Sequence, residues 1–458
     1  MKAWEYTHRL IREAQPVVLS EENQTWVAIM EGEKSADALL CLQWSSHVPG
    51  SGAPESVILG AVQSMENMGY DVRSAEAIAE EGLEAFRRRD MQELNALTAR
   101  LYKKLDELPR DPSSSYHGCR VYGSFEEYAD AVRFPKRQRV DTSSDVFLDR
   151  SYAGWLAQIC GGALGTALEG YTTERLKARF GDIHGYVRPP NTYNDDITYE
   201  IAFLEAFERS GRAVRSEEIA ERWIALVPSG WSAEQIALEN IRRGIFPPDS
   251  GKFRNPYREW IGAQMRGAIC GQVAPGDPAE AARLAWIDAV VSHHGNGVLG
   301  EVFNAVLVSL AYVESDMRAC VERAAELIPA DSEYRSVLNF ALERCAAGDA
   351  GGAWAACEDR YSHYNWIHAY PNAAAEVVAL WFGEADFDET MRLVCMCGQD
   401  VDCNAAQIGT AVGAMRGGAA IGERWSAPLG DVIKTYLRGM RELSLRELAR
   451  RTAAAAAR

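Results

Sequence analysis

The chain has 458 residues, of which 47% are hydrophobic and 25% are charged, which is typical of a globular protein in water. Its formal net charge of −17 argues against a general nucleic-acid surface, because contacts with phosphates need clustered Lys and Arg. The stretches 153–168 and 405–421 are rich in Gly and Ala but fall short of the roughly 20 apolar residues of a membrane span. We expect both to be buried helices of a protein that binds neither nucleic acid nor a membrane.

The N-terminus and the cysteines bear on the cellular compartment. Residues Met1 to Tyr6 are polar and lack the apolar segment of a secretory signal. The ten cysteines include no CxxC pair and no zinc-finger spacing. We therefore expect a cytoplasmic protein with reduced, buried thiols.

Helical periodicity dominates the chain, and strand signals are sparse. Apolar residues recur at three- and four-residue steps with charges between them, which predicts amphipathic helices. Stretches of this kind are 75–86, 91–108, 217–226, 279–291, 317–328 and 334–346. The chain is therefore expected to be all-α. The alanine run 453–457 is expected to be a frayed helix end without function.

Two polar stretches divide the chain into two regions. The run Pro109 to Ser115 is rich in Pro and Ser, and a second polar stretch covers Lys136 to Asp145. Such runs usually mark loops or boundaries. We predict a helical N-terminal region over residues 1–145 and a main region over residues 146–458.

Two acidic clusters lie about two hundred residues apart. The first is Asn194-Asp195-Asp196, and the second contains Asp400 and Asp402. Packed carboxylates resist ionisation unless a cation neutralises them, and hard divalent ions prefer oxygen ligands. Adjacent acids are common and Asp also caps helices, so each cluster on its own is readily explained as a polar loop or a helix cap. The two clusters form a metal site only if they meet in space.

The neighbouring sequence indicates how they could meet. Asp195 and Asp196 are predicted to lie in the opening turn of a helix, whereas Asp400 and Asp402 do not share a helix face and belong in a loop or at a helix start. The small-residue helix after Asp402 could dock against the glycine-rich helix over 154–165. Glu169 follows the glycine-rich helix over 154–165, either as a surface residue or as a carboxylate held at the candidate metal site.

Two further segments carry unusual side chains. The segment 255–264 contains two aromatic residues, two amides and the pair Arg258–Glu259, which is expected to be a structural or surface ion pair. The segment 292–301 contains His293 and His294. Adjacent residues on a helix point in different directions, so we do not assign these two imidazoles as ligands of one metal ion.

Four blocks in this order resemble the ADP-ribosylglycohydrolase family. They are the Gly/Ala helix that ends near Glu169, the cluster 194–196, the turn 292–297, and the segment 400–404 with its Gly/Ala helix. The chain looks most similar to a longer bacterial branch, which shares the segment 255–264 and the helical N-terminal region. The resemblance implies an all-α fold that encloses two Mg²⁺ or Mn²⁺ ions. It also implies hydrolysis of an N- or O-glycosidic bond at the anomeric carbon of an ADP-ribose-like group.

The resemblance also implies roles for individual residues. The implied metal ligands are Asn194, Asp195, Asp196, Asp400, Asp402 and Cys403. The implied catalytic residues are Glu169, Asp196 and Asp402. Substrate contacts are expected at Tyr199, His293, Asn296 and Gly297. The expected substrate is an ADP-ribosylated protein or a nucleotide-like small molecule.

The chain departs from the family pattern at four positions. Asn194 is neutral, Ile197 stands where Thr is common, Gly162 stands where many relatives have Asp, and the thiol of Cys403 is a poor ligand for Mg²⁺. These departures keep open a catalytically weakened family member that binds ADP-ribose or has a structural role. A phosphoesterase with two metal ions is a third reading, but the chain lacks the His-rich ligand pattern of many such enzymes.

Overall fold

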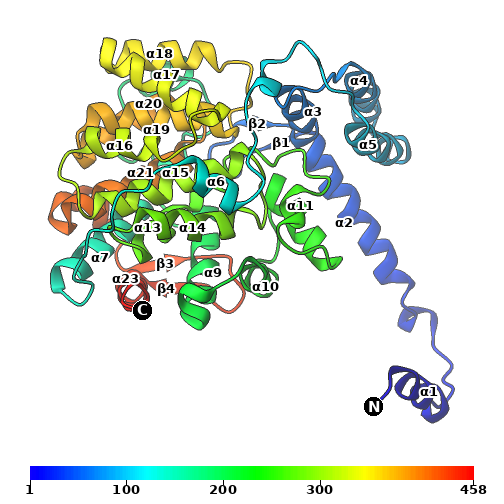
Figure 1. Ribbon diagram of the computed structural model, residues 1–458. Helices are drawn as coiled ribbons and strands as arrows, with labels where there is room; N and C mark the ends of the chain where they lie inside the picture. The colour runs from blue at the N-terminus through cyan, green and yellow to red at the C-terminus, as the bar shows by residue number, and fades with distance from the viewer.

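The computed structural model describes residues 1–458 and contains 23 α-helices and only four short strands (Figure 1). The predicted all-α class is confirmed. The strands form two separate antiparallel pairs, each of two strands. None of the helices combines the length and the apolar character that crossing a bilayer requires.

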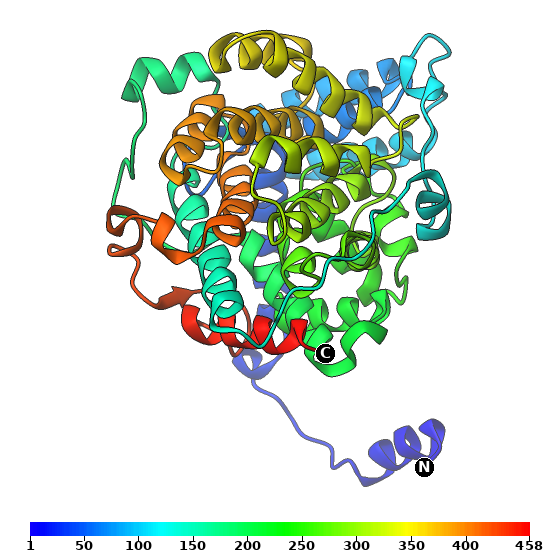
Figure 2. The ribbon, with the colours of Figure 1, turned by 60° about the vertical axis from the view of Figure 1, so that its left-hand side comes forward.

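The N-terminal region begins with an arm that projects from the rest of the molecule (Figures 1 and 2). Helix α1 buries no residue, and α2 buries only Leu40 and Trp44 at its end. The Trp44 indole donates a hydrogen bond to Thr98 Oγ1 at 2.8 Å, which attaches the end of α2 to α5. The elements are α1 (Ala3–Glu13), α2 (Trp26–Trp44), β1 (Ser46–His47), β2 (Pro54–Glu55), α3 (Val57–Asn67), α4 (Arg73–Arg88), α5 (Met91–Asp106) and α6 (Phe125–Ala131).

The main region is a bundle of helices around several that are buried on nearly every side. Every residue of α15 is buried, as expected for a helix that is apolar all round. In chain order, its helices are α7 (Asp145–Gly165), α8 (Thr173–Phe180), α9 (Asp195–Ser210), α10 (Ser216–Leu226), α11 (Ser232–Arg242), α12 (Asp249–Lys252), α13 (Ala268–Val273), α14 (Pro278–Ala289), α15 (Asn296–Ala311), α16 (Met317–Glu326), α17 (Glu333–Ala347), α18 (Ala350–Arg360), α19 (Ala369–Gly383), α20 (Phe387–Cys397), α21 (Val401–Arg416), α22 (Glu423–Ser426) and α23 (Leu445–Ala456).

The remaining regular elements are short. The second strand pair joins β3 (Val432–Lys434) to β4 (Glu442–Ser444), just before α23. The 3₁₀ helices cover Glu21–Asn23, Ser115–Gly118, Gly211–Ala213, Gln264–Arg266 and Gly418–Ala420.

The six helices predicted from periodicity are all present, as α4, α5, α10, α14, α16 and α17. Four of them begin at a side chain that caps free backbone N–H groups, which fixes the start of the helix. These caps are Asp90, Asp277, Asp316 and Ser332.

The predicted frayed end at residues 453–457 is wrong. Helix α23 continues to Ala456, and Ala455 and Ala456 are buried. The Trp155 indole of α7 donates a hydrogen bond to Thr452 Oγ1 at 2.9 Å, which anchors the helix. A run of alanines offers small side chains for close packing, but its composition does not reveal which surface will cover it.

Helices α7 and α21 pack along their lengths through small residues, which confirms the predicted docking of the two Gly/Ala helices. A Cβ atom added at Gly161 would lie 2.4 Å from the carbonyl oxygen of Ala405. One added at Gly165 would lie 2.2 Å from Cα of Asp402. The missing side chains therefore let the last turn of α7 contact the backbone of the second acidic cluster.

The Gly165→Ala variant is expected to lose about 3 kcal/mol or more of unfolding free energy, because its methyl group meets backbone that cannot shift alone. Gly185→Ala is the matched control, because no atom lies within 4 Å of the added Cβ there. Urea unfolding followed by circular dichroism measures both variants. Equal stability would contradict the close packing of α7 on α21.

The hydrophobic core runs without a break across the predicted boundary. It includes side chains of α3, α4 and α5 together with those of the main region. Helix α7 begins at Asp145, the last residue of the predicted N-terminal region. The two regions therefore share one core, into which α3, α4 and α5 are packed.

Candidate metal and catalytic centre

The starts of two helices bring the two acidic clusters together. Asp195 and Asp196 open α9, and Asp400 and Asp402 open α21, as predicted. We call these four residues the acid cluster. Ligand atoms of Asp195, Asp196 and Cys403 lie within 4.8 Å of one another, and so do those of Asp400, Asp402 and Cys403. The prediction that the clusters meet in space is confirmed.

Asn194 links the two helix starts directly. Its side-chain oxygen accepts a hydrogen bond from the Asp196 backbone N–H at 2.7 Å, which caps α9. Its amide nitrogen donates to Asp402 Oδ2 at 3.3 Å. A Cβ atom added at Gly162 would lie 3.0 Å from that same nitrogen. The small residue at position 162 thus leaves room for the amide of Asn194 between the two helices.

Several carboxylate oxygens of the acid cluster are buried without a hydrogen-bond partner. They are both side-chain oxygens of Asp196, Oδ1 of Asp400 and Oδ1 of Asp402. Burial and then the neighbouring carboxylate Asp195 raise the pKa of Asp196 well above its usual value. Burial, followed by the charge of Asp402, also raises the pKa of Asp400 well above its usual value. The same two causes raise the pKa of Asp195 to about 6. Unpaired carboxylate oxygens converging from two helices fit a hard divalent cation, which would remove the repulsion between them.

Glu169 lies beside the acid cluster, on the turn between α7 and α8. The Gly170 N–H donates to the Gln399 carbonyl at 2.9 Å, and the Gln399 N–H donates to the Tyr171 carbonyl at 3.2 Å. These bonds fasten the Glu169 turn to the residue before Asp400. Desolvation, followed by the charges of Asp402 and Asp400, raises the pKa of Glu169 well above its usual value. The structure therefore brings Glu169 to the acid cluster rather than leaving it as an isolated surface carboxylate.

Comparisons with known proteins agree with this arrangement. The sequence profile described as ADP-ribosylglycohydrolase matches residues 143–457, which contain the acid cluster and Glu169. The chain belongs to the ADP-ribosylglycohydrolase family. A protein of Archaeoglobus fulgidus, described as an uncharacterized protein, is 27% identical over 284 residues, which cover 59% of this chain and 88% of that protein. A solved structure described as an ADP-ribosylglycohydrolase-related protein complex matches with a TM-score of 0.50 and 22% identity, over 69% of this chain and 99% of that chain, and so shows the shared fold.

The ADP-ribosylglycohydrolase match does not include the N-terminal hairpin of residues 46–55, which nevertheless reaches the candidate site. A Cβ atom added at Gly50 would lie 2.2 Å from the Thr166 carbonyl oxygen and 3.0 Å from Glu169 Oε1. Arg188 donates to the Gly50 carbonyl at 2.5 Å and to the Thr166 carbonyl at 3.4 Å. Sequence reasoning missed this contact. The Gly and Pro residues around position 50 indicate a turn, but nothing in them indicates where it lies.

The Arg188→Ala variant is expected to loosen the hairpin without weakening the acid cluster. Loss of the two hydrogen bonds costs about 1–2 kcal/mol locally, so amide exchange in residues 46–55 should become roughly tenfold faster. Hydrogen exchange read by mass spectrometry measures this. Arg175→Ala is the control, because Arg175 is exposed on α8 and its side chain makes no ion pair or hydrogen bond. Unchanged exchange in residues 46–55 would show that Arg188 does not hold the hairpin.

Asn372 of α19 is a second residue that sequence reasoning missed. Its side-chain oxygen accepts hydrogen bonds from the Asp400 backbone N–H at 3.0 Å and from Asn404 Nδ2 at 2.7 Å. Its nitrogen donates to the carbonyl oxygens of Trp366 and His368, both at 2.8 Å. Asn372 therefore fixes the start of α21 and, with it, the position of Asp400. No local motif around residue 372 marks this role.

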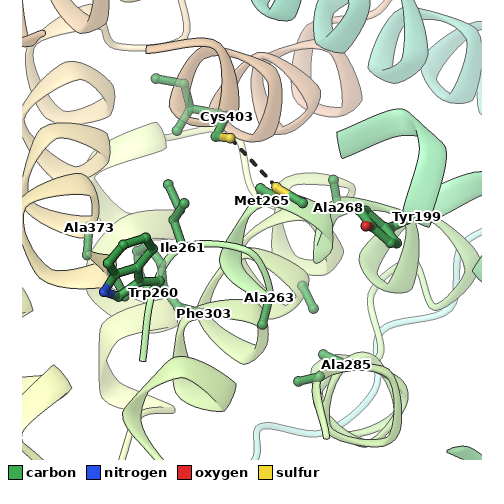
Figure 3. Packing of buried hydrophobic residues seen from close by; sticks show 14 of the residues in the cluster. Tyr199, Trp260, Ile261, Ala263, Met265, Ala268, Ala285, Phe303, Ala373 and Cys403 are labelled. Atoms are coloured by element: carbon green, nitrogen blue, oxygen red, sulfur yellow. Dashed lines mark hydrogen bonds between the residues drawn. The ribbon is translucent and has the colours of Figure 1, made fainter. Parts of the chain in front are cut away.

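The thiol of Cys403 lies among the acids but also contacts a buried methionine. Its Sγ is 3.7 Å from Met265 Sδ (Figure 3). Burial, followed by the charge of Asp196 and then that of Asp400, raises the pKa of the thiol well above its usual value. A neutral thiol is a poor ligand for Mg²⁺. Metal binding by Cys403 stays a prediction, and these surroundings do not favour it.

The four residues expected to contact a substrate are all buried in the interior. The Tyr199 ring packs 4.4 Å from the Trp223 ring, one turn along α9 from Asp195. His293 Nδ1 lies 2.7 Å from Ser292 Oγ, and Asn296 Nδ2 donates to Glu259 Oε1 at 3.1 Å. Gly297 packs against the backbone of residues 258 and 259. Their contact with a substrate stays a prediction that this burial does not favour.

Proposed function

We propose that this protein is a metal-dependent hydrolase that cleaves a glycosidic bond to ADP-ribose or to a related N-ribosyl group. The bond would join that group to a protein side chain or to a small nucleotide-like metabolite. One observation carries the proposal. In a chain that belongs to the ADP-ribosylglycohydrolase family, carboxylates from the starts of α9 and α21 converge with unpaired oxygens beside Glu169.

The donor set indicates how a cation would be held. The carboxylates of Asp195, Asp196, Asp400 and Asp402 would bind Mg²⁺ or Mn²⁺, with Asn194 orienting Asp402 through its amide. Each helix start contributes two carboxylates, and these two pairs of oxygen donors support the expectation of two ions. When bound, such ions would polarise a sugar hydroxyl or a water molecule and lower its pKa.

Glu169 is proposed to transfer a proton in the reaction as a general acid or base. Burial and the neighbouring acids raise the pKa of Glu169, which favours the protonated carboxyl group that a general acid needs. A carboxylate beside the anomeric carbon would also stabilise the oxocarbenium-like transition state of glycosidic cleavage. The hairpin of residues 46–55 covers one side of Glu169 and would keep bulk water from that side.

A substrate panel tests the proposal. The full chain is incubated with ADP-ribosylated proteins and with nucleotide ribosides, with and without Mn²⁺, and the products are identified by mass spectrometry. The expected result is a free ribose-bearing product that forms only with the ion. Binding of ADP-ribose without release would instead support a non-catalytic family member. Release of inorganic phosphate would support the phosphoesterase reading.

A further inference from the structure

A cavity of about 710 Å³ lies between the N-terminal helices α3 and α5 and the segment 252–258 of the main region. Met65 and Tyr102 line it from the N-terminal side, and Lys252, Arg258 and His294 line it from the main region. None of its lining residues belongs to the acid cluster or the Glu169 turn. Its volume is within the range of about 300–1,000 Å³ typical of small-molecule sites.

The cavity is basic, although the chain carries a net charge of −17. Its walls contain five Lys and Arg side chains, two His side chains and one carboxylate, that of Asp106. Asp106 is engaged by Arg254, whose Nε lies 2.7 Å from Asp106 Oδ2. Arg110, Lys252 and Arg258 form no salt bridge with any carboxylate of the chain. Three cations without a carboxylate partner around one cavity favour an anionic ligand.

The positive potential of this wall also acts on His294. Burial, followed by the charges of Arg258 and Lys252, lowers the pKa of His294 to about 4. At neutral pH the imidazole is therefore uncharged and can offer a hydrogen bond without adding to the repulsion.

The wall that carries Arg258 is held rigidly. The buried amide of Asn255 donates to the carbonyl oxygens of Gly251 at 3.1 Å and Ser292 at 2.9 Å. Arg258 Nη1 donates to the Asn255 carbonyl at 3.0 Å. The expected Arg258–Glu259 ion pair is not formed, because Glu259 is buried and accepts hydrogen bonds from Tyr116 and Asn296. The fixed backbone therefore places Arg258 at the cavity. The Glu259 carboxylate is hydrogen-bonded by Tyr116 and Asn296 instead of by Arg258.

Aromatic side chains complete the lining. Tyr70, Tyr102 and Tyr116 belong to the wall. The hydroxyl groups of Tyr102 and Tyr257 lie 3.1 Å apart, and the Tyr116 hydroxyl donates to Glu259 Oε1 at 2.8 Å. These bonds fix the rings of Tyr102 and Tyr116 beside the cations. Fixed rings beside cations suit a ligand that has both a flat ring and negative charge.

We propose that this cavity is a second ligand site, which binds a small organic diphosphate that carries an aromatic ring, that is, a nucleoside diphosphate. Arg110, Lys252 and Arg258 hold the phosphates, and the tyrosine rings contact the base. The site bridges the N-terminal region and the main region, so the ligand fastens one to the other. The acidic net charge of the chain disfavours a nucleic acid. This site does not depend on the hydrolase function proposed for the acid cluster.

Isothermal titration of the full chain with ADP, in EDTA, tests the proposal. ADP is expected to bind, pyrophosphate to bind more weakly, and adenosine not to bind. Higher KCl concentration should weaken the binding, because the contacts are ionic. Failure of millimolar ADP to bind would overturn the proposal. So would tighter binding of a short single-stranded RNA than of ADP.

Variants locate the site. The double variant Lys252→Gln, Arg258→Gln is expected to weaken ADP binding at least about tenfold through the loss of charge-assisted hydrogen bonds. The matched control is Lys2→Gln, Arg9→Gln on the projecting arm, which should bind like the wild type. Arg110→Gln, on an exposed residue, replaces the double variant if the latter does not fold. Asp400→Asn should bind ADP like the wild type. Equal affinity in the cavity variants, or loss only in Asp400→Asn, would overturn the proposal.

Discussion

Asp400→Asn is expected to weaken Mn²⁺ binding at least about 100-fold and to abolish turnover, because it removes one charged carboxylate from the proposed metal site. The fold should survive. The Asp400 side chain makes no capping hydrogen bond, and its backbone N–H keeps its bond to Asn372. The change also preserves volume, so it opens no cavity.

The effect of Asp400→Asn on stability is expected to depend on whether a divalent ion is bound. Without divalent ions its melting temperature should equal or exceed that of the wild type, because one of several crowded, buried charges is gone. With Mn²⁺ at about 100 times its Kd the wild type should gain about 2.7 kcal/mol, and the variant almost nothing. Calorimetric titration and thermal unfolding measure both effects. Asp359→Asn is the control, since Asp359 is exposed and its carboxylate has no partner. An unchanged Mn²⁺ affinity would remove Asp400 from the site.

The acid cluster was predictable because its signals are local. Two carboxylates at a helix start and a run of small residues behind them can be read within a few positions. Close packing of α7 on α21 requires Gly at positions such as 161 and 165, and those glycines are visible in the sequence. The pairing of the two helices then follows from the fact that both surfaces are small and apolar.

The contacts that orient the cluster were not predictable, because they join residues far apart in the chain. Asn372 reaches Asp400 from another helix, and Gly50 reaches Glu169 from the N-terminal hairpin. Their local sequences would be compatible with many other partners. The buried positions of His293 and Asn296 were missed for a similar reason, since a polar side chain looks exposed until its buried partner is known.

The N-terminal region acquires a role from these long-range contacts. Its hairpin covers the turn that carries Glu169, and α3 and α5 form one wall of the basic cavity. The N-terminal side of each contact lies outside residues 143–457, which the family profile matches. The features that adapt this chain to its own substrate are therefore expected in the N-terminal region, while the acid cluster lies within the residues that the family shares and is proposed to supply the chemistry.

Glu169→Gln is expected to bind Mn²⁺ like the wild type but to turn over about 10²–10⁴ times more slowly, because an amide cannot exchange the proton that a carboxyl group exchanges. Gln has nearly the same volume as Glu, so the contact with Gly50 and the bonds that fasten the turn remain. Metal affinity comes from a calorimetric titration, and kcat from the substrate found in the panel.

Glu174→Gln is the matched control, since Glu174 is exposed on α8 a few residues further along the chain. A Glu169→Gln variant with an unchanged kcat would remove Glu169 from the mechanism, whatever the metal affinity of the variant. A variant that loses both metal and turnover would make Glu169 a ligand instead. The combination of intact metal binding and lost turnover separates a proton-transferring carboxyl group from the aspartates beside it, because only the aspartates present unpaired oxygens from both helix starts.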